Sequence, residues 1–86
     1  MSEFLVEAYL SRSDSPVDEL HFHEVSPVVR FVRSIFVPED ETCFYLFEAP
    51  SVEAVREAAH RAGLQVERVS EATVAADRNN RADKTP

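Results

Sequence analysis

The most informative segment of the chain is residues 42–64, TCFYLFEAPSVEAVREAAHRAGL. Its first part carries apolar side chains on both faces of an extended chain, which is typical of a central strand covered on both sides. Ser51 is a good N-cap residue, and Gly63 is suited to the left-handed conformation that ends many helices. The segment therefore predicts a strand over 42–48 followed directly by a helix over 51–63.

Three further strands are predicted on either side of this segment. Residues 3–10 alternate apolar and other side chains, which predicts a first strand. Residues 28–37 are mainly β-branched and aromatic and end in a turn at 38–41, so a second strand and a hairpin precede the central strand. Residues 66–74 are more polar and predict a fourth strand.

A short first helix is predicted between the first two strands. Ser15 is a plausible N-cap and Pro16 a plausible first helical residue. The helix must end by about Val25, because Pro27 forces the residue before it out of the helical region. The resulting order, βαββαβ, predicts an α+β fold of the ferredoxin-like sandwich type.

In a ferredoxin-like sandwich the helices cover only one face of the sheet. The other face of this chain still carries large apolar side chains, and an exposed patch of that kind normally marks an interface. A face-to-face homodimer, in the manner of a dimeric α+β barrel, is the simplest way to cover it. Residues 1–75 are expected to form this domain, and residues 76–86 a disordered polar tail.

Composition narrows the functional classes. The net charge of -7 repels phosphate backbones, so nucleic acid is not an expected partner. The single cysteine excludes an internal disulfide and fits the reducing cytoplasm. There is no uncharged apolar stretch of the roughly 18 residues that a membrane span needs. With one glycine in the chain, phosphate-binding loops are excluded as well.

Several short motifs resemble a family of small nickel-binding, ferredoxin-like proteins. They are FLVE at residues 4–7, RFVRS at 30–34, DETCFYLFEAP at 40–50 and VREAAHRAGL at 55–64. The resemblance implies a dimeric α+β domain that binds nickel in at least one branch of the family, most members having no assigned activity. Two departures are a first-helix region at 11–27 that is shorter than expected and Ala58, where many relatives carry histidine.

The sharpest local feature for metal chemistry is His21-Phe22-His23-Glu24, with Glu19 one helical turn before His23. Imidazole and carboxylate together suit nickel, copper or zinc. In an extended segment His21 and His23 would face the same side and could chelate a metal ion. In a helix they point apart, and Glu19 with His23 becomes an ordinary surface pair.

Cys43 is a further candidate, as a soft metal ligand or as a nucleophile if a basic neighbour lowers its pKa. The alternative is that it is a small apolar residue of the core. The metal candidates are therefore His21, His23, Glu24 and Cys43, whereas His60 on the second helix is expected to be solvated.

A different candidate site involves Glu7, a charge in an otherwise apolar strand. Glu7 would pair with an arginine across the sheet, or join Tyr9 and Tyr45 in a pocket between sheet and helices. A carboxylate beside two phenols would suit proton transfer.

Three functions remain open at this point. The first is a cytoplasmic homodimer that binds a divalent transition metal such as nickel. The second is a cofactor-independent enzyme or a carrier of a small apolar ligand, and the third is an interaction module without chemistry of its own.

Overall fold

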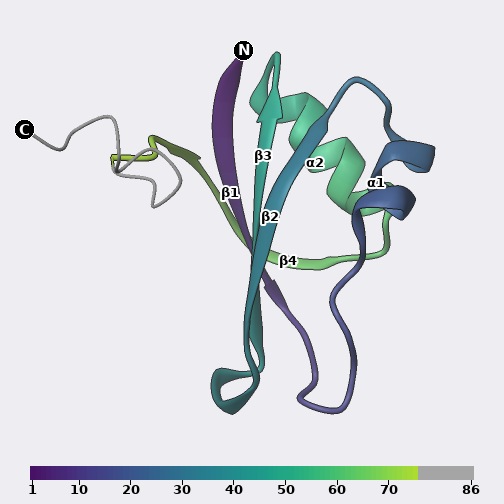
Figure 1. The fold of residues 1–86 in the computed structure, drawn as a ribbon, viewed down its shortest axis with the longest axis vertical. Helices are drawn as coiled ribbons and strands as arrows, with labels where there is room; N and C mark the ends of the chain where they lie inside the picture. The colour runs from purple at the N-terminus through teal and green to yellow at the C-terminus, as the bar shows by residue number, and fades with distance from the viewer. Residues whose placement is uncertain (76–86) are drawn as a thin grey trace, which may run out of the picture.

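The structure is a computed structural model that describes residues 1–75 (Figure 1). The predicted polar tail, 76–86, lies outside the described residues. The elements follow the predicted order, with a short 3-10 helix, η1, in the hairpin turn: β1 (Ser2–Tyr9), α1 (Glu19–Val25), β2 (Arg30–Val37), η1 (Pro38–Asp40), β3 (Thr42–Ala49), α2 (Val52–Arg61) and β4 (Gln65–Ala72).

The strands form one 4-stranded sheet in the order β2-β3-β1-β4. All three neighbouring pairs are antiparallel. The chain is therefore an α+β domain whose sheet and helices are compatible with a ferredoxin-like fold. β1 and β3 are the inner strands, and β2 and β4 are the edges.

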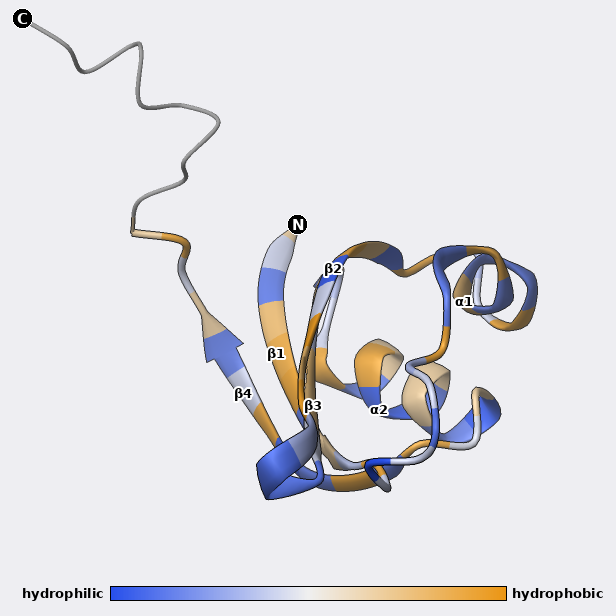
Figure 2. Ribbon diagram, turned by 60° about the horizontal axis from the view of Figure 1, so that its bottom comes forward, coloured by the Kyte–Doolittle hydropathy of each residue, from blue (hydrophilic) through white to orange (hydrophobic). Residues whose placement is uncertain are grey.

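Both α-helices lie on the same side of the sheet (Figure 2). The core fills the space between them and the sheet, and Phe22 of α1 is its main contribution from the first helix. The Phe22 ring packs edge-on against Phe47, with centroids 4.9 Å apart, and stacks on Phe31 at 5.4 Å. The fully packed residues are Phe4, Val6, Ala8, Phe22, Val29, Cys43, Tyr45, Phe47, Ala49, Val55, Ala58 and Ala59.

The second helix, α2, lies where the local sequence signals predicted it. The Ser51 hydroxyl accepts a hydrogen bond from the Ala54 amide at 3.2 Å, which satisfies one of the free amides at the start of α2. Gly63 has a φ of 81°, the left-handed conformation expected after the last turn. The buried residues of α2 are Val55, Ala58 and Ala59.

The first helix begins later than predicted. Asp18, not Ser15, is the N-cap, and its carboxylate accepts a hydrogen bond from the His21 amide at 3.0 Å. The Val17 amide instead donates to the Tyr45 hydroxyl at 3.3 Å, a contact with β3 that holds the preceding segment in a non-helical path. The helix is consequently one of 7 residues.

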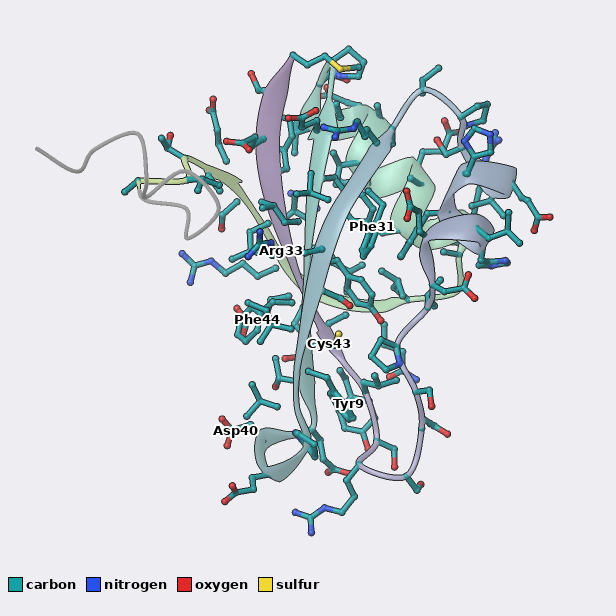
Figure 3. The ribbon with its side chains drawn as sticks, viewed as in Figure 1. Tyr9, Phe31, Arg33, Asp40, Cys43 and Phe44 are labelled. Carbon is teal, nitrogen blue, oxygen red and sulfur yellow. The ribbon has the colours of Figure 1, made fainter. Side chains whose placement is uncertain are left out.

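The helices of the single chain cover one face of β3, so the predicted cover of its second face by a dimer partner stays a prediction. β3 is an inner strand, but the helices cover only the face that carries Cys43, Tyr45 and Phe47. In Figure 3, Phe31 points toward the helices, whereas Arg33 and Phe44 point to the other side of the sheet. We call this second side the open face.

The register defines the centre of the open face. Leu5 lies opposite Leu46 across β1 and β3, and Ile35 lies opposite Phe44 across β2 and β3. Ile35 is 56% exposed. Within residues 1–75, no helix is long and apolar enough to cross a membrane.

Candidate functional site

The structure places His21, His23 and Glu24 on α1, with all three side chains exposed. Because α1 is helical, His21 and His23 point to different sides of it. The chelating pair that an extended segment would form is therefore not present within one chain. Phe22, between them, is buried and anchors the helix to the core.

The helix does bring Glu19 and His23 to one place. They are one turn apart and line a hollow of about 250 Å³ between α1 and the start of β2. Its remaining wall is formed by the turn after α1 and the first residues of β2, namely Pro27, Val29, Arg30 and Phe31. The Glu19 carboxylate and the His23 imidazole thus line one hollow. The sequence predicted this pairing for a helical segment, but only as an ordinary surface pair.

Two contacts hold the elements around this hollow in place. Phe31 stacks on Phe22, so β2 and α1 are held together by their aromatic side chains. Arg61 of α2 donates to the Val25 carbonyl at 3.4 Å and pairs with Glu57 at 3.1 Å. Arg61 thereby ties the last residue of α1 to the second helix.

Arg30 lines this hollow as the first residue of β2, but its side chain lies on the other side of the sheet, the open face. It forms an ion pair with Glu48 across β2 and β3, where the two residues are register partners. The side chain of Arg30 is still 68% exposed.

Cys43 lies in the core, with no exposed surface, on the helix-facing side of β3. Burial raises the pKa of its thiol, and a hydrogen bond with Tyr45 offsets part of this effect. The thiolate, which is the form that binds metals and attacks electrophiles, is therefore disfavoured at neutral pH. Within residues 1–75, no three His, Cys, Asp or Glu side chains are grouped so that they could hold one metal ion.

The structure does not bring Glu7, Tyr9 and Tyr45 together. Tyr45 is the register partner of Val6 and shares its helix-facing side, so the neighbouring Glu7 belongs to the open face. Glu7 lies opposite Arg68 of β4. Because successive side chains of a strand point to opposite faces, the Glu7 carboxylate and the buried Tyr45 phenol lie on different sides of the sheet.

Tyr9 and Tyr45 do line one hollow of about 170 Å³, at the end of the sheet where β4 begins. Burial and the hydrogen bond with Cys43 raise the pKa of Tyr45 to about 12. The phenol is therefore protonated at neutral pH, and the carboxylate residue that lines this hollow is Asp14, not the predicted Glu7.

A family model described as nickel responsive protein SCO4226-like matches residues 7–72. The chain belongs to this family. The resemblance found in the sequence is thereby confirmed, and the SCO4226-like region includes α1, the hollow of Glu19 and His23, and all of β2 to β4.

A crystal structure of an SCO4226-like protein, SCO4226 from Streptomyces coelicolor A3(2), is similar to this chain with a TM-score of 0.64 and 26% sequence identity. The match covers 87% of this chain and 100% of that one. No curated protein matches the chain.

Proposed function

We propose that this chain is a homodimeric binding protein for a divalent transition metal, with nickel as the expected ion. The observation that carries the proposal is that Glu19 and His23 line the same hollow. The description of the SCO4226-like family as nickel responsive supports nickel over other divalent ions.

The donors in the hollow suit this ion. Imidazole is a common ligand for nickel, and carboxylate oxygens bind divalent cations generally. Both side chains are exposed, so neither must be uncovered before it binds. When bound, the metal would join Glu19 to His23 across one turn of α1, and solvent or a further ligand would complete its coordination.

The homodimer is proposed from the open face. Its apolar residues are the exposed Ile35, the half-buried Leu5 and Phe44, and Leu46, which its neighbours on the sheet already bury. A contiguous apolar patch on a small domain is a typical interface. A second copy of the chain, packed face to face as in a dimeric α+β barrel, would remove it from water.

The metal proposal is tested by calorimetric titration of tag-free protein with nickel and with zinc, while the mass in solution is measured in parallel. His23→Ala and Glu19→Gln should each weaken nickel binding by about tenfold or more, because each removes one of two protein ligands. His21→Ala and His60→Ala are matched controls, since both histidines are exposed and lie outside the hollow.

The outcomes separate the candidates. Loss of binding in His23→Ala with unchanged binding in both controls supports the proposed ligands. An equal loss of nickel binding in His21→Ala would indicate that His21 and His23 are the ligands. An absence of nickel binding by the folded wild-type protein would overturn the proposal.

A further inference from the structure

A second hollow, of about 190 Å³, lies between α2 and the start of β4. Its lining residues are Arg56, His60, Leu64 and Val66, so it combines two basic side chains with two apolar ones. None of these residues lines the proposed nickel site. We call this second hollow the α2–β4 hollow.

The geometry of α2 places both basic side chains on the α2–β4 hollow. Arg56 and His60 are four residues apart, so they lie one above the other on one flank of the helix. The opposite flank carries Arg61, which reaches the Val25 carbonyl of α1. Arg56 and His60 therefore lie on the side of α2 that faces away from α1 and toward β4.

The apolar part of the α2–β4 hollow is incompletely covered. Val66 is the register partner of Ala8, whose side chain is buried on the helix-facing side of the sheet. Val66 nevertheless remains 38% exposed, as is expected in an edge strand. An apolar group placed against Val66 and the half-buried Leu64 would remove apolar surface from water, which is favourable.

The donors of the two basic side chains are available to a ligand. In the part of the chain that the structure describes, neither Arg56 nor His60 forms an ion pair or a hydrogen bond through its side chain. Glu57, which follows Arg56 directly, pairs with Arg61 on the other flank. Glu53, one turn before Arg56, does not line the α2–β4 hollow.

From these donors and the apolar floor together we propose that the α2–β4 hollow binds a small monocarboxylate with an apolar body, such as an aromatic acid. The planar guanidinium of Arg56 matches a carboxylate through two parallel hydrogen bonds, and a ring N–H of His60 supplies a third. Leu64 and Val66 contact the apolar body.

Size and charge narrow the class of ligand. The volume equals the liquid volume of about six water molecules, which limits the ligand to a small acid. The net charge of -7 repels anions of higher charge more strongly, which favours a monoanion over a phosphate or a polycarboxylate.

The experiment is a titration of isotope-labelled full-length protein with benzoate, followed by the backbone amide signals in NMR spectra. Benzoate should shift the signals of Arg56, His60, Leu64 and Val66 in a saturable manner. Acetate keeps the charge without the apolar body, and benzamide keeps the body without the charge. Each should bind at least about fivefold more weakly than benzoate, because each lacks one of the two interactions.

Two variants test the two parts of the α2–β4 hollow. Arg56→Gln removes the guanidinium and should weaken benzoate binding about fivefold or more, a magnitude suited to an exposed charge pair. Val66→Thr keeps the shape of the floor but adds a hydroxyl, so it should weaken benzoate and leave acetate unchanged. Arg12→Gln is the matched control, since Arg12 is an exposed arginine outside the hollow.

The opposite results would overturn the proposal. They are benzoate binding that Arg56→Gln leaves unchanged, equal affinity for acetate and benzoate, or saturable shifts confined to residues outside the α2–β4 hollow. Because this hollow shares no residue with the proposed nickel site, failure of either proposal leaves the other standing.

Discussion

The backbone amide of Val17 donates a hydrogen bond to the phenolic oxygen of Tyr45 at 3.3 Å. This contact joins the segment before α1 to the inner strand β3, 28 residues away in the sequence. Tyr45→Phe removes the acceptor and leaves a partly buried amide without a partner. The free energy of unfolding should fall by about 1–2 kcal/mol, as measured by urea denaturation.

Tyr9→Phe is the control for this substitution. Tyr9 is 40% exposed, and its hydroxyl reaches Glu41 only at 3.5 Å. Loss of so weak a surface contact should change stability by less than about 0.5 kcal/mol. Equal effects of the two substitutions would show that the contact between Val17 and Tyr45 contributes no stability of its own.

The stability of the protein should decrease in alkaline solution because of the same tyrosine. In the folded protein burial raises the pKa of Tyr45 from 10.0 to about 12. Between these values the unfolded chain has lost a proton that the folded chain retains, so stability is fully present below pH 10 and is lost as the pH rises toward 12.

Urea denaturation at pH values on both sides of this window tests the effect. In Tyr45→Phe the decrease should become smaller, and what remains should include the contribution of Cys43, whose pKa is also raised above 9.0. An identical pH dependence in the variant and in the wild type would contradict the assignment to Tyr45.

Cys43 should resist alkylation in the folded protein. Its side chain has no exposed surface, and burial keeps the thiol protonated. Its reaction with iodoacetamide near neutral pH should be at least about a hundredfold slower than in the urea-unfolded chain, because it requires an opening of the core. A comparable rate in both states would show that the thiol is accessible and would revive it as a nucleophile or metal ligand.

Local signals allowed much of this fold to be predicted. α2 is marked by Ser51 at one end and Gly63 at the other, and both act within a few residues of their own position. The start of α1 was mispredicted, because the Val17 amide is bound by a residue far along the chain. Ser15 carried a valid capping signal, but Asp18 carried another, and a tertiary contact decided between them.

In the candidate site, too, the sequence predicted what local spacing determines and missed what distant strand pairing determines. Glu19 and His23 are one turn apart, so their meeting follows from the helix alone. The grouping of Glu7 with Tyr45 failed because the pairing of Val6 with Tyr45 determines which face each side chain occupies. A register between distant strands is set by the whole sheet, and no local pattern in either strand reports it.

The N-cap of α1 should control metal binding without contacting the metal. Asp18→Ala removes the acceptor of the His21 amide, which should cost about 1 kcal/mol of helix stability and loosen the spacing between Glu19 and His23. Nickel affinity measured by calorimetry should fall accordingly. Asp18→Asn retains a capping oxygen and should bind nickel nearly as the wild type does, whereas equally weak binding by both variants would indicate a role for the Asp18 charge instead.

The open face provides the test of the homodimer. Ile35 and Val28 are similarly exposed, at 56% and 58%, but Ile35 lies opposite Phe44 on the open face and Val28 lies in the turn after α1. Ile35→Lys places a charge in the proposed interface, where burying it without a partner is strongly unfavourable. Val28→Lys makes the same chemical change away from that interface.

Sedimentation equilibrium should therefore give twice the chain mass of 9.7 kDa for the wild type and for Val28→Lys, and a mass shifted toward the monomer for Ile35→Lys at the same concentration. Dissociation of Val28→Lys alone would indicate that the interface lies on the side of α1 and not on the open face. A wild-type protein that stays monomeric would leave the open face without a second copy, and the homodimer would have to be abandoned.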